Sequence, residues 1–166
     1  MTLADLHSLN RDEFIETVGP VFEHSPWIAE RTAGPFLSVD DLHAKLVATV
    51  EAASIDEKLS LIRAHPDLVG RLAREGKLTR ESTSEQAAAG LTDLSNEEVE
   101  LFEQYNAAYR EQFGFPFVIC ARENKKHAIL AAFPVRLRNS PEQEIATALA
   151  EIYKIARLRL ADLIQE

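Results

Sequence analysis

The fold is organised around residues 61–70, which read LIRAHPDLVG. An apolar helical pattern runs into this stretch from Ile55, and Pro66 ends it, because a residue that precedes proline is pushed out of the α region. His65 is therefore predicted to lie at or near the C-terminal end of a helix. Residues 82–86, STSEQ, follow soon after and contain Glu85. A histidine at a helix end with an acidic residue nearby is a workable acid/base pair.

Helix-start signals recur along the rest of the chain. Asn10 with Glu13, and Ser95 with Glu98, have the spacing of a capping box. Further helices are predicted to begin at Ser25-Pro26, Ser38, Ser54, Ser82 or Ser84, and Ser140-Pro141.

Three other segments complete the predicted architecture. Residues 67–75 are predicted to form one short helix, and residues 125–138 a helix that Pro134 kinks or shortens. Residues 115–120, FPFVIC, are the only apolar run with an extended pattern, and they are too short to build a sheet, so we interpret them as a buried connector. The sequence thus predicts an all-α fold, with residues 1–166 forming a single domain, a multi-helix bundle of roughly seven to nine helices.

The composition excludes several classes of function. The net charge of −9 argues against binding to a nucleic-acid backbone, which needs clustered Lys and Arg. No apolar run approaches the roughly 18–20 residues needed to span a bilayer. The single cysteine, Cys120, excludes an intrachain disulfide and a cysteine-rich zinc site. The N-terminus lacks a signal-peptide pattern and the C-terminus lacks a Ser-Lys-Leu address, so we expect a cytoplasmic protein.

The main candidates for chemistry each have a structural explanation as well. Histidines at helix ends, such as His65, are often structural, and a glutamate in the first turn of a helix, as predicted for Glu85, is favoured by the helix dipole. Arg159 lies beside Leu160, on or near the apolar face of the last helix. A buried arginine needs an anionic partner, and a carboxylate ligand is one such partner.

Other reactive residues give weaker signals. His24 lies beside a helix start and fits a structural role as well as a place in a site. The pair His65 and Asp67 alone is a weak metal signal, and no His-Glu-x-x-His, Gly-x-Ser-x-Gly or glycine-rich phosphate motif is present. Cys120 lies in an apolar run, where burial raises the pKa of a thiol and makes it a poor nucleophile. The histidines expected to be plain surface residues are His7, His43 and His127.

Four motifs occur in order along the chain: FEHSPW at 22–27, RAHPDL at 63–68, STSEQ at 82–86 and FGFPFVICAR at 113–122. Together, and with IYKIA at 152–156, they closely resemble the OHCU decarboxylases of urate degradation. That family acts on 2-oxo-4-hydroxy-4-carboxy-5-ureidoimidazoline (OHCU), releases CO2 and leaves (S)-allantoin.

The resemblance implies roles for particular residues. His65 matches the catalytic histidine, and Glu85 matches an essential acid. Pro66 matches a residue whose backbone touches the substrate ring, and Arg159 matches an arginine that pairs with the substrate. The other substrate-binding residues that the resemblance implies are Ser82, Thr83, Ser84, Gln86, Phe117, Val118, Ile119, Cys120 and Ala121.

The resemblance also implies partners and a mechanism. The family needs no cofactor, and we expect no metal, a homodimer, a small-molecule substrate, and neither a nucleic-acid nor a membrane partner. His65 is expected to act as general acid and base, with Glu85 orienting the substrate. Two other interpretations stay open: a helical binding domain without activity, and a metal-dependent hydrolase that uses His65, Asp67 and Glu85.

Overall fold

The computed structural model describes residues 1–165, without the side chain of residue 72. Over these residues the ordered structure is helical, and the only β-type pairing is one parallel bridge between Thr2 and Gln165. Eight of the α-helices described there exceed four residues, and two are single turns. The predicted all-α fold is therefore confirmed. No helix in this described part is long and apolar enough to cross a membrane.

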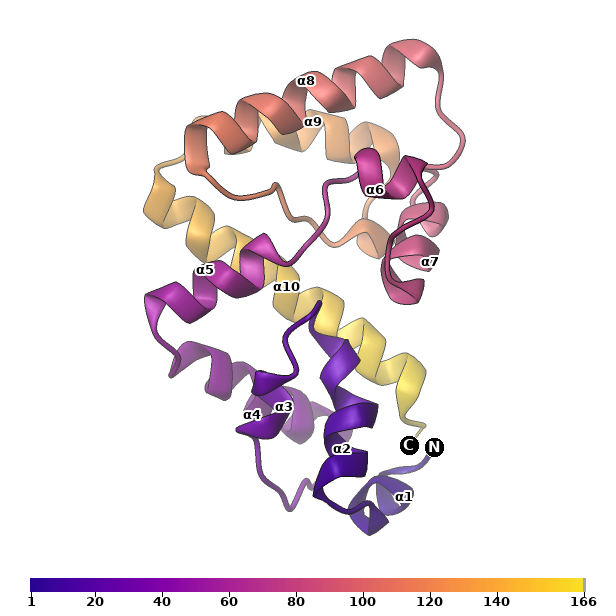
Figure 1. Cartoon of the computed structure of the whole chain (residues 1–166), viewed down its shortest axis with the longest axis vertical. Helices are drawn as coiled ribbons and strands as arrows, with labels where there is room; N and C mark the ends of the chain where they lie inside the picture. The colour runs from indigo at the N-terminus through magenta and orange to yellow at the C-terminus, as the bar shows by residue number, and fades with distance from the viewer. Residues whose placement is uncertain (166) are drawn as a thin grey trace. The chain divides into compact units, whose positions relative to one another are not determined.

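The chain's internal contacts group into two compact units, residues 1–64 with 153–166, and residues 65–152. The first unit contains helices α1 to α5, and the second contains α6 to α9 (Figure 1). Helix α10 contributes its first part to the second unit and the remainder to the first. The sequence predicted that residues 1–166 form a single domain, and this stays a prediction.

Three helices of the first unit begin at the capping residues that the sequence indicated. Asn10 forms a capping box with Glu13, Ser54 forms one with Glu57, and Ser38 accepts a hydrogen bond from a first-turn backbone N–H. The first helix was not predicted, although Thr2 caps it in the same way. The elements are α1 (Leu3–Ser8), α2 (Arg11–Val18), η1 (Gly19–Val21), α3 (Trp27–Glu30), α4 (Val39–Glu51) and α5 (Ile55–Arg63).

Apolar side chains from each of the longer helices close the core of the first unit. They recur at helical spacing, so each helix presents one apolar face. Its most fully buried members are Val18, Phe22, Ile28, Leu42, Leu46, Val50, Leu61, Ile62, Ala156 and Leu160.

The second unit is built on two long helices that lie side by side, α8 (Asn96–Phe113) and α9 (Lys126–Arg136) (Figure 1). Ser95 and Glu98 form the predicted capping box, and Gly114 ends α8 in the left-handed conformation that glycine favours at this position. The shorter elements are α6 (Arg71–Arg74), α7 (Arg80–Ala88) and η2 (Ala121–Glu123), and α10 (Pro141–Leu163) begins after Ser140 as predicted.

The structure corrects two predicted helix boundaries in the second unit. Residues 67–70 are not helical; they form a turn in which Val69 has a φ of 55°, and helix α6 begins only at Arg71. Neither Ser82 nor Ser84 caps α7, because Thr79 accepts the hydrogen bond from the Ser82 backbone N–H at 3.2 Å. Ser82 instead lies inside the first turn and is buried.

Three other sequence predictions concern the start of α3, the end of α9 and the buried connector. Ser25 does not cap α3, since its hydroxyl donates to the Glu23 carbonyl oxygen at 2.8 Å. Pro134 lies inside α9, which ends at Arg136 and so is shorter than predicted. Residues 115–120 form an irregular segment with every residue buried, which confirms the prediction of a buried connector.

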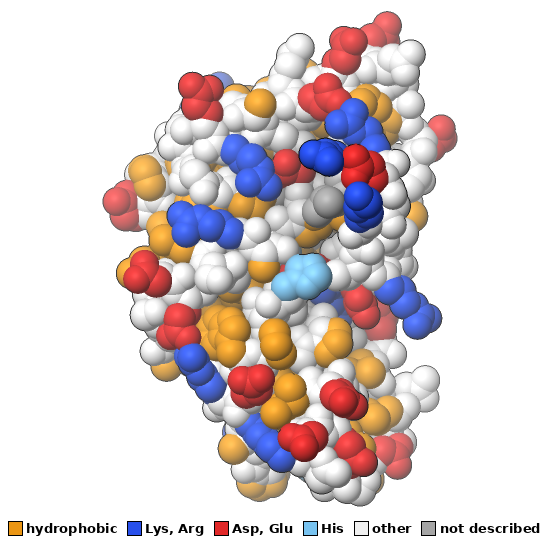
Figure 2. All heavy atoms as spheres, viewed as in Figure 1, with side chains coloured by type: hydrophobic (Ala, Val, Ile, Leu, Met, Phe, Trp, Pro, Cys, Tyr) orange, Lys and Arg blue, Asp and Glu red, His pale blue; other side chains and the backbone are white. Residues whose placement is uncertain are grey.

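The exposed surface carries acidic and basic side chains interspersed with each other on the face shown in Figure 2. Ion pairs near the surface include Arg31 with Glu57 and Arg74 with Glu103, each with 2.5 Å between nitrogen and oxygen. Surface pairs of this kind contribute little to stability, so the apolar cores and helix caps hold each unit together.

Candidate functional site

His65 follows the end of α5, where the sequence placed it. Helix α5 ends at Arg63, Ala64 is its C-terminal cap, and His65 is 6 % exposed. The imidazole is therefore largely removed from water, and Pro66 after it is half-buried. His65 is thus a titratable group held at the end of an ordered element, and its acid/base role stays a prediction.

The turn after His65 is held by side chains from two helices. Asn106 of α8 donates from Nδ2 to the Leu68 carbonyl oxygen at 2.8 Å. One turn further along α8, Arg110 donates from Nε to the Asp67 carboxylate at 3.0 Å. Asp67 is thus engaged by an arginine, and no group of three His, Cys, Asp or Glu side chains suited to a metal occurs among the described residues.

Helix α7 carries the polar cluster of residues 82–86. Its Gln86 accepts a hydrogen bond at Oε1 from the buried Val69 N–H at 3.1 Å, and its Nε2 lies 3.5 Å from the Asp67 carbonyl oxygen. The helix that bears Glu85 is therefore fastened to the turn that follows His65. Ser82 and Gln86 are buried, Glu85 is half-buried, and Thr83 and Ser84 are exposed.

Helix α7 also packs against η2, which follows the buried connector. Burial is the main cause that raises the pKa of the Cys120 thiol, and the charges of Glu123, Glu151 and Glu85 raise it further. The raised thiol pKa agrees with the prediction that Cys120 is a poor nucleophile.

The side chains of the connector are buried, and protein partners bind two of the backbone groups of Cys120. The Phe117 ring is 1 % exposed and stacks on Phe133 with 3.8 Å between ring centroids, so it belongs to the core. The Cys120 N–H donates to the Glu151 carboxylate at 3.2 Å, and the Cys120 carbonyl oxygen accepts from Asn124 Nδ2 at 2.9 Å. Val118, Ile119 and Ala121 are buried as well.

Arg159 belongs to the first unit and has the buried, charged environment that the sequence suggested. It is 6 % exposed, and its Nη2 donates to the Glu23 carboxylate at 2.8 Å, while Nη1 donates to the Pro20 carbonyl oxygen at 3.2 Å. A protein carboxylate thus serves as its anionic partner. The neighbouring His24 has a φ of 45° and a side chain that is 68 % exposed. Pairing of Arg159 with substrate stays a prediction.

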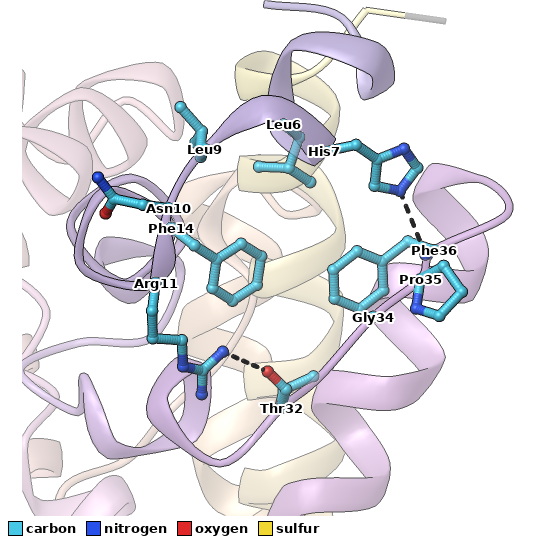
Figure 3. Close-up of a pocket in the computed structure, with 10 residues that line it drawn as sticks. All are labelled: Leu6, His7, Leu9, Asn10, Arg11, Phe14, Thr32, Gly34, Pro35 and Phe36. Atoms are coloured by element: carbon cyan, nitrogen blue, oxygen red, sulfur yellow. Dashed lines mark hydrogen bonds between the residues drawn. The ribbon is translucent and has the colours of Figure 1, made fainter.

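A cavity of about 410 Å³ lies elsewhere in the first unit (Figure 3). Its polar groups are engaged in internal contacts: Arg11 Nη1 donates to the Thr32 carbonyl oxygen at 2.9 Å, and His7 Nε2 accepts from the Phe36 N–H at 3.3 Å. Phe14 and Phe36 stack across it with 5.6 Å between ring centroids. None of the predicted site residues lines this cavity, so it is not the candidate site.

Some partners of the candidate segments were not indicated by the sequence. Asn106, Arg110 and Glu151 each hold the backbone or a side chain of a candidate segment from far away in the chain. No local motif marks them, because each lies in an ordinary helical pattern. His43 was expected on the surface, but it is half-buried and hydrogen-bonded to the Tyr153 carbonyl oxygen at 2.8 Å.

Comparison with known proteins decides the family. The profile of the OHCU decarboxylase family matches residues 7–161. This chain belongs to the OHCU decarboxylase family. It is 43 % identical over 164 residues to a 2-oxo-4-hydroxy-4-carboxy-5-ureidoimidazoline decarboxylase from Haloferax volcanii, covering 98 % of this chain and 95 % of that one. A protein of the same name from Amia calva is 42 % identical over 167 residues, covering 99 % and 95 %.

A solved structure agrees with this assignment. The crystal structure of an (S)-allantoin synthase matches with a TM-score of 0.80 and 34 % identity, covering 99 % of this chain and 54 % of that chain. The OHCU decarboxylase resemblance drawn from the four sequence motifs is therefore confirmed.

Proposed function

We propose that this chain is a carboxy-lyase that converts OHCU to (S)-allantoin and CO2 in urate catabolism, with His65 as general acid and base and Glu85 orienting the substrate. The observation that carries the reaction is membership of the OHCU decarboxylase family across residues 7–161. The residue roles come from the resemblance of the motifs, and the arrangement of the second unit supports them.

The substrate supplies its own electron sink. Its carboxylate is attached to a carbon that bears a hydroxyl group and lies next to a ring C=N bond. When the C–CO2 bond breaks, its electron pair moves into the C=N system, and the resulting intermediate then takes up a proton on carbon. The protein must therefore orient the carboxylate, exclude water and deliver that proton to one face.

His65 is suited to the proton transfer by its placement. It is largely buried, and the turn that follows it is held from two helices by Asn106, Arg110 and Gln86. A positioned acid/base of this kind contributes typically about 10²–10⁴-fold to a rate. In our proposal, His65 exchanges the proton of the substrate hydroxyl or ring and protonates the intermediate.

Glu85 is suited to orientation because its helix is tied to the same turn. Gln86, the next residue, binds Val69, and α7 packs on η2, so Glu85 is placed relative to both the turn and the connector. Its carboxylate would accept a hydrogen bond from the substrate hydroxyl or a ring N–H. Backbone groups of residues 117–121 would bind the ureido amides, and Ser82 would add a hydroxyl.

Several expectations about this enzyme remain proposals. They are the homodimer, the cytoplasmic location, a reaction without cofactor or metal, and the pairing of Arg159 with substrate charge. The binding of Arg159 to Glu23 gives that arginine a structural role in addition.

The test generates OHCU in place from urate with a urate oxidase and a hydroxyisourate hydrolase, and follows circular dichroism. We expect the protein to accelerate the appearance of (S)-allantoin over the rate in buffer, with the same rate after dialysis against a chelator. Racemic product at the buffer rate would refute the activity and favour a binding domain. Loss of activity on chelation, restored by metal, would favour the metal-dependent alternative.

A further inference from the structure

One buried side chain outside the proposed catalytic set contacts the connector from the core. Arg136, in the last turn of α9, is 6 % exposed. Its Nη1 donates to the Val118 carbonyl oxygen at 2.5 Å, and its guanidinium lies over the Phe117 ring, 4.2 Å from the ring centroid. A single side chain therefore engages two successive residues of the connector, one through its backbone and one through its ring.

The guanidinium is itself fixed by a buried acid. Arg136 Nε donates to Glu144 Oε1 at 2.8 Å, and Glu144 is 0 % exposed. The Tyr109 hydroxyl donates to the same oxygen, and Asn139 Nδ2 donates to Glu144 Oε2 at 2.8 Å. Because the planar fork of an arginine is rigid, binding Glu144 with one edge sets the direction of the other edge toward Val118.

Two backbone groups of the connector are thus bound by different charged side chains. Arg136 binds the carbonyl of Val118, and Glu151 of α10 binds the N–H of Cys120. A buried ion pair is weak evidence for stability, because apolar residues of similar volume often stabilise a core as well or better. Its geometry, which directs a donor at one backbone carbonyl, points to positioning.

We infer that Arg136 is a positioning residue of the OHCU decarboxylase reaction, which holds the backbone of residues 117–119 in the orientation that binds the substrate's ureido arm. The inference rests on the proposed function. Arg136 touches core groups and the connector, and acts on the substrate only through them. Its removal lets the Val118 peptide rotate, and a displacement of about 1 Å in a binding group is enough to cost about 100-fold.

The test compares two changes in the same network. Arg136→Met with Glu144→Gln removes the bond to Val118 without leaving an unpaired buried charge. Tyr109→Phe removes a partner of Glu144 and leaves the bond to Val118 intact. We expect the double variant to lose about 10–100-fold in kcat/KM with a raised KM, because the connector binds the ureido arm before and during the reaction. We expect Tyr109→Phe to stay within about threefold of wild type.

Arg136→Lys is the conservative variant in this test. A lysine ammonium is a point charge that cannot reach both partners in fixed directions, so its kcat/KM should lie between those of the wild type and the double variant. If Arg136 had only a structural role, its replacement would lower the folded, active fraction, and so lower the apparent kcat at unchanged KM. Variants of equal stability would then lose equal activity. That pattern would overturn the inference.

Hydrogen–deuterium exchange separates this inference from the proposed function. Faster exchange in the 117–121 segment of the double variant, with Tyr109→Phe like wild type, would support the holding role by a readout independent of turnover. Unchanged exchange in the double variant would overturn it even in a fully active protein. If wild type does not turn over OHCU, the proposed function fails first, and with it the assignment of Arg136 to this reaction.

Discussion

Replacing Glu23 by glutamine removes the negative charge from a carboxylate that is 2 % exposed and 2.8 Å from the Arg159 guanidinium. The glutamine keeps the size of the side chain and an oxygen that can accept, so the cost is mainly electrostatic. Removing one partner of a buried ion pair typically costs about 3–5 kcal/mol. Arg159→Met removes the other partner and should cost a similar amount. The double variant loses the same interaction once, so its cost should be at least about 2 kcal/mol below the sum.

The assay is urea unfolding followed by the fluorescence of Trp27. It is the single tryptophan of the chain and lies in the same compact unit as Glu23 and Arg159. With a denaturant dependence of about 2 kcal/mol/M, a loss of 3–5 kcal/mol lowers the midpoint by about 1.5–2.5 M. Arg157→Met is the matched control on the same helix, because its partner Asp40 is 73 % exposed, and its cost should be below about 1 kcal/mol.

The result that would refute this reasoning is additivity. If the Glu23→Gln and Arg159→Met costs simply add, or if either is as small as that of Arg157→Met, the buried pair does not couple the two residues. The same variants also test the predicted pairing of Arg159 with substrate. Glu23→Gln keeps the guanidinium, so a greater loss of turnover in Arg159→Met at equal stability would support pairing with substrate.

Three further outcomes follow from individual contacts. Gln86→Leu removes the oxygen that accepts from the buried Val69 N–H, where the backbone is left-handed, and should cost about 1–3 kcal/mol and lower kcat, measured by urea unfolding and the dichroism assay. The pKa of Glu57 is lowered by the Arg31 side chain and the Ser54 N–H, so its contribution to stability is present above the ordinary glutamate pKa and is lost as pH falls below it; Glu57→Gln should flatten the fall of the unfolding midpoint below about pH 4. Burial raises the pKa of the Cys120 thiol, so folded protein at pH 8 should resist alkylation that proceeds readily in urea, as read by mass spectrometry.

Helix ends were the most predictable part of the fold, because each cap is a local interaction over three residues. Asn10, Ser54 and Ser95 cap as predicted, and Pro66 marks the helix end before His65. The start of α7 was wrong by a few residues, since Thr79, Ser82 and Ser84 can all cap a helix. In the structure Thr79 caps α7 and Ser82 is buried in the first turn, and the sequence alone does not show which of the three residues is the cap.

The turn at residues 67–70 was the clearest error, and its cause is long-range. Residues 67–75 were predicted to form one helix, but Leu68 and Val69 are held by Asn106 and Gln86, from α8 and α7. Such contacts satisfy backbone groups that a helix would have satisfied internally. Local propensity does not reveal them.

Motifs in the sequence indicate His65 and Glu85 as candidates, and their catalytic roles stay predictions. The sequence did not indicate the partners of the buried arginines, because the pairing of Arg136 with Val118 and of Arg159 with Glu23 joins residues 18 and 136 positions apart. An arginine in an amphipathic helix looks alike whether it is solvated or buried. Only the packed structure tells the two cases apart.

The most direct test of the central claim is the rate of (S)-allantoin formation, by circular dichroism, for His65→Asn and Glu85→Gln against His127→Asn and Glu81→Gln. The controls change an exposed histidine on α9 and a glutamate on the same helix as Glu85. Our account predicts that the first two variants fold like wild type and lose at least about 100-fold in kcat, while both controls keep the wild-type rate. Wild-type rate and stereochemistry in His65→Asn, in protein of unchanged stability, would contradict it.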